Sequence, residues 1–116
     1  MKFRFQDLTI WRFALEISDR LLDVADELES RKLYRFSEQL RGAAMSMCNN
    51  IAEGSGSSSN REFGNFLNVA RRSAFENANI LIILNRRKLL SDPQLASLLG
   101  DLDKECRMIT SLRRRL

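Results

Sequence analysis

The polar residues best suited to forming a site flank a short Gly and Ser loop near the middle of the chain. Those before the loop are Asn49, Asn50 and Glu53, and those after it are Arg61, Glu62 and Asn65. If helices flank the loop, amide, carboxylate and guanidinium groups meet across an antiparallel pair. Counting back from the loop places Asn50 level with Asn65, and it places Gln39 and Arg41 level with Ser73, Glu76 and Asn77.

Such a set could hold a polar ligand, or its members could satisfy one another as a structural network. We interpret it as a network that holds the two helices together, because buried polar groups need hydrogen-bond partners. Glu53 would lie in the last turn of its helix, where the helix dipole disfavours an anion. We therefore expect Glu53 to pair with Arg61 or with the backbone N–H groups that open the next helix.

The sequence contains no residue pattern typical of a catalytic site. The chain contains no His, which excludes a His-dependent triad and the Glu-x-x-His metal site of carboxylate bundles. Cys48 and Cys106 lack metal-ligand spacing, and we expect both to be small buried residues rather than a disulfide or a nucleophile. Gly56 belongs to neither a phosphate-binding loop nor a dinucleotide fingerprint. We expect no catalytic residue, metal or cofactor, and a protein that is not an enzyme.

Basic residues concentrate in the second half of the chain. The first 58 residues contain eight Lys or Arg and nine Asp or Glu, whereas the last 58 contain eleven and six. A basic half with Arg clusters suits an acidic partner such as RNA or DNA, although helix C-termini favour cations in any case. The candidate nucleic-acid-binding residues are Arg61, Arg71, Arg72, Arg86, Arg87, Lys88, Arg113, Arg114 and Arg115.

Four amphipathic helices must position these groups, at about residues 8–29, 34–53, 60–89 and 93–115 of a single all-α domain. Short connections between helices of similar length predict an up-down-up-down four-helix bundle. We expect Asp7 to cap the first helix, and Gly54 to end the second in the left-handed conformation. Ser59 with Glu62 forms a capping box, and Ser91-Asp92-Pro93 restarts the fourth helix. Gly100 within that helix predicts close packing.

The apolar faces of two helices are wider than one bundle needs. The first helix adds a second row of Ile10, Phe13, Ile17 and Val24 beside its main stripe, and the third is apolar around most of its circumference from Ile80 to Leu84. A monomer would expose these residues as a contiguous patch. We therefore predict a closed homo-oligomer, with candidate interface residues Ile10, Phe13, Ile17, Ile80 and Ile83.

The chain resembles a known family of four-helix bundles. The resemblance lies in the segments Gln39-Leu40-Arg41, Asn50-Ile51-Ala52-Glu53-Gly54, Glu62-Phe63 and Phe66-Leu67, together with Phe5-Gln6-Asp7-Leu8 and Trp11 near the start. These look like the signature of the proteins encoded in intervening sequences of bacterial 23S ribosomal RNA. The matching motif residues are Gln39, Arg41, Ser46, Asn50, Glu53, Gly54, Glu62, Ser73 and Glu76, and Asn77 stands where the family usually has Leu.

The resemblance implies a left-handed up-down bundle that assembles into rings of five. It also implies kinship with the accessory protein of diversity-generating retroelements, a basic five-fold bundle that binds nucleic acid and a reverse transcriptase. On this basis these nine residues would be a structural motif of the family. A homopentamer is expected only from the resemblance.

Two functions are consistent with the sequence. The first is a non-enzymatic oligomeric accessory protein that binds structured RNA or DNA through its Arg and Lys clusters. The second is a protein-interaction scaffold with no direct nucleic-acid role, whose partner could be a reverse transcriptase. The sequence shows neither a signal peptide nor a membrane span, so we expect a cytoplasmic protein without a membrane partner.

Overall fold

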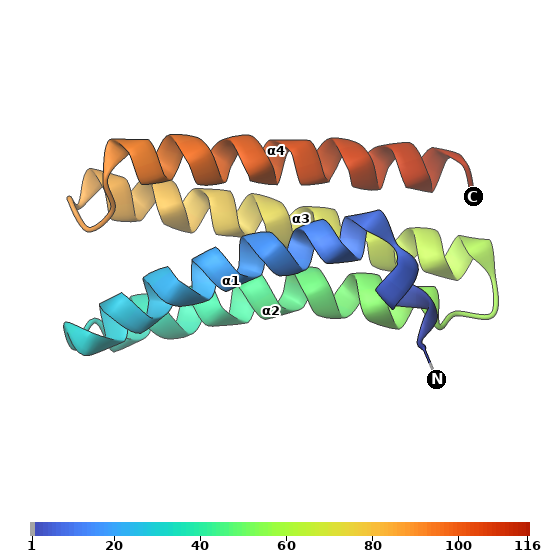
Figure 1. Cartoon of the computed structure of the whole chain (residues 1–116), viewed down its shortest axis with the longest axis horizontal. Helices are drawn as coiled ribbons and strands as arrows, with labels where there is room; N and C mark the ends of the chain where they lie inside the picture. Colours follow the sequence, from blue (N-terminus) through green and yellow to red (C-terminus); the bar gives the residue numbers. More distant parts are fainter. Residues whose placement is uncertain (1) are drawn as a thin grey trace.

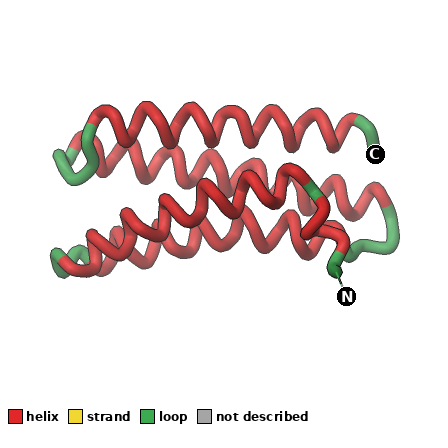
Figure 2. Tube along the Cα trace, viewed as in Figure 1, coloured by secondary structure: helices red, strands yellow, loops and turns green. Residues whose placement is uncertain are grey.

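Four long α-helices account for most of the structure. The computed structural model describes residues 2–116. Over this range α1 spans Thr9–Ser30, α2 Tyr34–Ser55, α3 Asn60–Arg86 and α4 Asp92–Arg114, and a short 3-10 helix, η1, precedes them at Arg4–Asp7 (Figure 1, Figure 2). No strand occurs in the described residues. The predicted all-α four-helix bundle is confirmed, and every helix end lies within three residues of its predicted position.

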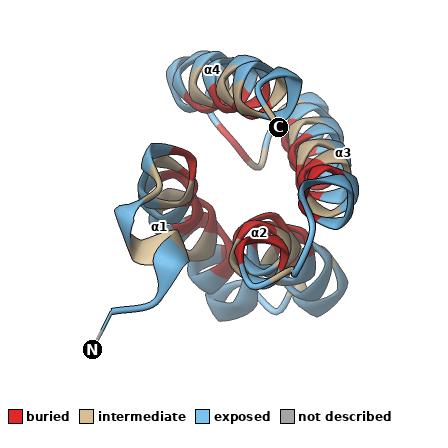
Figure 3. Ribbon diagram, turned by 90° about the vertical axis from the view of Figure 1, so that its right-hand side faces the viewer, coloured by how far each residue is buried: buried red, intermediate tan, exposed pale blue. Residues whose placement is uncertain are grey.

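Consecutive helices run in opposite directions along the long axis of a molecule that measures 43 × 25 × 20 Å (Figure 1). The α1–α2 and α3–α4 connections lie at one end, and the α2–α3 connection lies at the other end with both chain termini. The contact between α2 and α3 is the most extensive, whereas α1 and α4 contact each other least, as the end-on view in Figure 3 shows. Arg20 bridges these two helices by binding the Asp101 carboxylate and the Ser97 hydroxyl. The handedness of the bundle stays a prediction.

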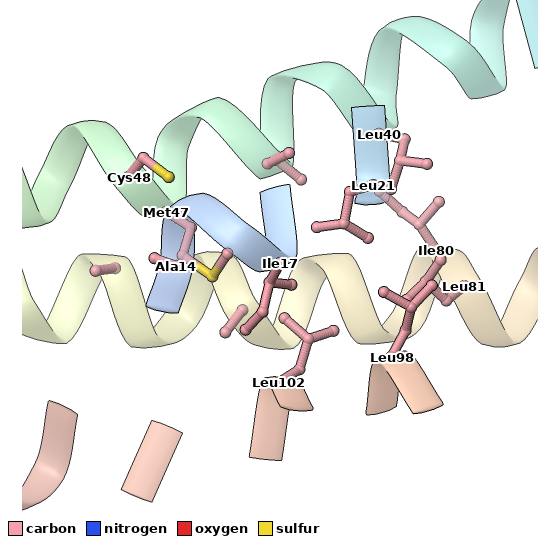
Figure 4. Close-up of a cluster of buried hydrophobic side chains, with 14 of the residues drawn as sticks. Ala14, Ile17, Leu21, Leu40, Met47, Cys48, Ile80, Leu81, Leu98 and Leu102 are labelled. Atoms are coloured by element: carbon pink, nitrogen blue, oxygen red, sulfur yellow. The ribbon is translucent and has the colours of Figure 1, made fainter. Parts of the chain in front are cut away.

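Apolar side chains from all four helices form one core (Figure 4). Its fully buried members include Ile17, Leu21, Leu40, Met47 and Leu81. The second apolar row of α1 belongs to this core, because α2 covers one side of α1 and α4 covers another. Ile10, Ile17 and Ile80 therefore lie inside the chain's own core instead of on an outward face. Of the predicted interface residues, Phe13 is half-buried and Ile83 is 40% exposed.

Serine side chains cap the starts of α3 and α4 as predicted, but the predicted capping box at α3 is only half formed, because the Glu62 side chain returns no hydrogen bond within the described residues. The Ser59 hydroxyl accepts a hydrogen bond from the Glu62 backbone N–H at 3.1 Å. Ser91 and Gln94 form a reciprocal capping box, with Pro93 in the first turn. The predicted Asp7 cap is wrong, because Asp7 lies in η1 and α1 begins after Leu8 without a side-chain cap.

Two lysines provide the left-handed caps that end α1 and α3. Lys32 has φ 64° and Lys88 has φ 61°. The next residue in each case donates its N–H back into the helix, from Leu33 to the Leu28 carbonyl and from Leu89 to the Leu84 carbonyl, both at 2.9 Å. This six-to-one bond is the mark of a Schellman cap.

Gly54 serves packing instead of capping. It lies within the last turn of α2, and no glycine in residues 2–116 has a positive φ. A Cβ atom at Gly54 would lie 2.6 Å from Phe66 Cβ and 2.9 Å from Phe63 Cδ1. The predicted left-handed cap is therefore wrong, and the glycine permits the close approach of α3. The prediction for Gly100 is also wrong, because nothing lies within 4 Å of a Cβ built there.

Candidate nucleic-acid interface

Several polar residues of the central helix pair form a partly buried network between α2 and α3. The hydroxyls of Ser46 and Ser73 lie 2.8 Å apart across the two helices. Asn50 donates to the Ser46 carbonyl at 2.8 Å, and Ser73 also bonds to the Val69 carbonyl. The Ser46–Ser73 bond joins the two helices, and the other two bonds satisfy the remaining polar groups within each helix, so this part of the predicted set is structural.

Asn77 extends the same network. It is fully buried, and its Nδ2 donates to the Ala43 carbonyl of α2 at 3.0 Å and to the Ser73 carbonyl at 2.9 Å. Its Oδ1 is buried without a hydrogen-bond partner in the described residues. Asn77 thus replaces the Leu expected from the family pattern with a second polar link between α2 and α3.

Other members of the predicted set lie outside this network. Arg41 forms a salt bridge with Asp26 at 2.9 Å and with Glu29 at 3.3 Å, so it joins α2 to α1 instead of α3. The predicted partner of Glu53 is wrong, because its exposed carboxylate makes no hydrogen bond or ion pair within residues 2–116. The remaining uncharged and acidic members are exposed, namely Gln39, Asn49, Glu62, Asn65 and Glu76.

The nine candidate cations fall into three places. Arg61 and Arg113–Arg115 lie toward the end that carries the termini, Arg86–Lys88 lie at the opposite end, and Arg71 and Arg72 lie along α3 between them (Figure 1). Arg71 is half-buried and the other eight are exposed. Within the described residues none of the nine forms an ion pair with a carboxylate; the cations that do are Lys2, Arg20, Arg41 and Arg107. Their charge is therefore available to an anionic partner.

Two further basic residues near the termini, Lys2 and Arg4, make contacts within the chain. Arg4 donates to the Ser55 carbonyl at 3.3 Å, and its guanidinium lies 4.9 Å from the centre of the Phe63 ring. Lys2 pairs with Asp7 at 3.3 Å. Arg4 fastens η1 onto the α2–α3 connection, whereas Arg61 and Arg113–Arg115 at this end pair with no carboxylate in the described residues.

A groove of about 540 Å³ lies between α3 and α4. Its apolar floor comes from both helices and comprises Ala74, Ala78, Leu99, Leu102 and Cys106. Arg71, Arg107 and Arg114 stand at its rim, and Phe75 lines it from α3. A smaller hollow shared by Arg71, Arg113 and Arg114 continues from it toward the end of α4.

Sequence reasoning missed Arg107 and Phe75 as site residues. Asp103, Arg107, Thr110 and Arg114 follow one another at intervals of four, three and four residues, a spacing that places them on one side of a helix. This pattern could have identified a basic side of α4 facing away from the core. Nothing in the sequence alone places Phe75 of α3 opposite it.

A buried carboxyl group was also missed. Glu105 is 0% exposed, and neither of its oxygens has a hydrogen-bond partner in residues 2–116. Burial raises the pKa of Glu105 to about 8. The signal was its place in the sequence, because Leu98, Leu102, Glu105 and Ile109 follow the four-three-four spacing of a core stripe.

The two cysteines are buried and free. Burial raises the pKa of the Cys48 thiol; a hydrogen bond with Ser18, at 3.2 Å between Oγ and Sγ, opposes the shift, and the Glu105 charge adds to it. Burial also raises the pKa of Cys106 against the opposing influence of Arg71. Thiols with raised pKa values are poor nucleophiles. No group of His, Cys, Asp and Glu side chains suited to a metal ion occurs in the described residues.

Comparison with known proteins identifies the family of this chain. The family model described as 23S rRNA-intervening sequence protein matches residues 6–111. The chain belongs to this family. No match was found among curated proteins.

The family fold also recurs in a solved structure. The crystal structure of a protein of unknown function from the S23 ribosomal protein family of Bacteroides thetaiotaomicron has a TM-score of 0.86 and 24% sequence identity to this chain. The match covers 90% of this chain and 98% of that one. At this identity the likeness shows the shared four-helix fold. No helix in residues 2–116 is long and apolar enough to cross a membrane.

Proposed function

We propose that this family member is a non-enzymatic, homo-oligomeric accessory protein that binds RNA or DNA, with its Arg and Lys clusters on phosphates. The observation that carries the proposal is the set of nine cations at the two ends and along α3, none of which is paired with a carboxylate in the described residues. Unpaired arginines on a rigid helical frame are a common way to recognise phosphate groups. A cytoplasmic location is part of the proposal.

Assembly would multiply these contacts. Each subunit of a ring, five by family resemblance, would contribute a copy of every cluster, and linked weak sites bind more tightly than single ones. Exposed apolar side chains on α3 support assembly, because Val69, Ile82 and Ile83 are each about two-fifths exposed. Ile83 and Phe13 are the predicted interface residues that the fold leaves accessible.

The test is fluorescence anisotropy with a structured ribosomal RNA fragment, titrated with salt. Two matched variants distinguish the ends of the molecule, one with Arg113, Arg114 and Arg115 changed to Gln and the other with Arg86, Arg87 and Lys88 changed to Gln. The variant that lacks the functional cluster should bind more weakly. Its plot of log K against log salt should be shallower by about one for each phosphate that the variant no longer binds.

Wild-type protein that shows no saturable binding even at low salt would refute the nucleic-acid function. Equal binding by both variants and the wild type would show that neither end carries it. Circular dichroism of each variant confirms that the helices are retained, since all six residues are exposed.

A second candidate is a protein-interaction scaffold, and the exposed apolar side chains favour it. Phe75 is 58% exposed and Ile82 is 44% exposed on α3. The partner class that the resemblance implies is a reverse transcriptase. Pull-down from lysate with and without nuclease separates a direct protein contact from one bridged by nucleic acid, and neighbouring genes that encode a consistent partner would support this function.

A further inference from the structure

The groove between α3 and α4 combines an apolar floor with a basic end. The floor side chains are small or aliphatic and leave a space of about 540 Å³, which is within the range of about 300–1,000 Å³ typical of sites for small organic groups. Phe75 lines this space and is 58% exposed. An aromatic ring beside an apolar floor suits a planar ring system.

Charge is distributed unequally along the groove. Arg71, Arg107 and Arg114 line it together with one acid, Asp103. Asp103 is already paired with Arg107 at 2.6 Å, so the charges of Arg71 and Arg114 are not neutralised. Arg113 joins them in the adjoining hollow. The groove therefore offers two or three guanidinium groups to an anion.

Arg71 connects the two parts of the groove. Its guanidinium carbon lies 5.0 Å from the centre of the Phe75 ring. Its Nε is buried and makes no hydrogen bond within the described residues. A cation stacked on an aromatic ring and lacking a carboxylate partner is arranged to bind an anion next to a planar group.

We infer that the α3–α4 groove binds one nucleotide unit of single-stranded RNA or DNA, with the base against Phe75 and the apolar floor and the phosphate at Arg71, Arg113 and Arg114. This assignment rests on the proposed nucleic-acid function. It names the groove as the binding site and single-stranded nucleic acid as the class of ligand. A single strand is required because a duplex buries the faces of its bases, and stacking on aromatic side chains is the usual mode of single-strand binding.

The groove is distinct from the outward side of α3. Ile83 follows Phe75 by eight residues, which places it about 80° further around the helix. A subunit that packs on Ile83 therefore need not cover Phe75. The two sites can be tested separately.

The first experiment compares two adjacent arginines of α3. Arg71 lines the groove, whereas Arg72 does not line it and is exposed. Anisotropy with a short single-stranded oligoribonucleotide should show a loss of roughly fivefold or more for Arg71→Gln. The matched Arg72→Gln variant removes the same charge outside the groove, so its loss should be clearly smaller and limited to one phosphate contact.

The second experiment tests base stacking. Phe75→Ser should weaken binding of the single strand by roughly fivefold to a hundredfold, the range for loss of one stacked base, while Phe75→Tyr should retain it. An abasic oligonucleotide with the same phosphates should bind wild type and Phe75→Ser equally. Photo-crosslinking of a thiouridine-containing strand, followed by peptide mapping, should mark α3 near Phe75 in the unmodified protein.

Several outcomes would overturn the groove assignment. Equal losses for Arg71→Gln and Arg72→Gln, or equal binding of abasic and normal strands, would leave general phosphate binding and remove the groove. A change of particle mass in Phe75→Ser with unchanged binding would assign the groove to a second copy of the chain. If the wild type binds neither single strands nor structured RNA, both the groove assignment and the proposed nucleic-acid function are refuted.

Discussion

Glu105 is a buried acid in a place where the bundle offers it no partner. The four core positions around it in α4 are apolar or a thiol, and its carboxyl group is fully enclosed. A carboxylate in such a place would carry a large desolvation cost, so the folded protein favours the protonated form. The consequence is a dependence of stability on pH that can be attributed to this residue.

Changing Glu105 to Gln should therefore stabilise the protein at neutral and alkaline pH. Burial raises the pKa from 4.5 to about 8, so the wild type is relatively most stable below about pH 4.5 and loses stability as the pH rises to about 8. At pH 7 Glu105→Gln should gain roughly 3 kcal/mol, with almost no gain near pH 4. Urea unfolding of both proteins at the two pH values measures this difference. A gain that is independent of pH would show that the carboxyl group does not titrate in this way.

Other residue-scale features explain why the site was only partly predictable. Counting along two antiparallel helices placed Asn50 level with Asn65 and Ser73 level with Gln39 and Arg41. In the structure Ser73 bonds to Ser46 across the helices, and Asn50 bonds to Ser46 within α2. Glu105 was missed because Cys106 beside it also fits an inward stripe, and both residues are buried. Arg41 was assigned to α3, but it reaches the carboxylates of α1, since a long side chain at a helix edge can bind either neighbour.

At the scale of the elements, helix contacts decide which glycines matter. α2 and α3 approach each other at Gly54, where a Cβ would meet two phenylalanines. Gly42 and Gly100 lie in α2 and α4 with nothing within 4 Å of such an atom. All three glycines lie within helices of the structure, and the packing of neighbouring helices distinguishes them.

Alanine substitutions should thus have opposite effects at these positions. Gly54→Ala should destabilise the protein by roughly 1–3 kcal/mol, because the added methyl group forces α2 and α3 apart. Gly42→Ala and Gly100→Ala should each stabilise it by about 0.5–1 kcal/mol, since Ala restricts the unfolded chain and favours a helix. Thermal unfolding followed by circular dichroism measures all three. A stabilised Gly54→Ala protein would contradict the close contact at α3.

Element boundaries were predictable where side chains define them. Ser59 and Ser91 cap their helices through local hydrogen bonds that the sequence encodes directly. The ends of α1 and α3 were less clear because Lys32 and Lys88 adopt a left-handed conformation that glycine usually provides. The α3–α4 groove could not be predicted, because it depends on how two helices pack and not on the pattern of either one.

At the scale of the whole molecule, the remaining exposed apolar side chains are the evidence for assembly. The wide apolar face of α1 is accounted for within one chain, because both α2 and α4 pack on it. α3 differs, since it has neighbours on two sides and still exposes Val69, Ile82 and Ile83 in addition to Phe75 in the groove. Three such residues outside the groove on one helix favour a contact between subunits.

A charge at Ile83 should consequently dissociate the assembly and leave the subunit folded. Ile83→Glu places a carboxylate on the proposed contact, where its desolvation would be unfavourable. Tyr34→Glu is the matched control, because Tyr34 is 54% exposed at the start of α2. Ile17→Glu should unfold the chain, because Ile17 is 1% exposed in the core. Light scattering coupled to size-exclusion chromatography should report a multiple of 13.4 kDa for wild type and Tyr34→Glu and a single subunit for Ile83→Glu. A wild-type protein that elutes as a monodisperse monomer at micromolar concentration would refute the assembly, and with it the repeated cationic sites on which tight nucleic-acid binding depends.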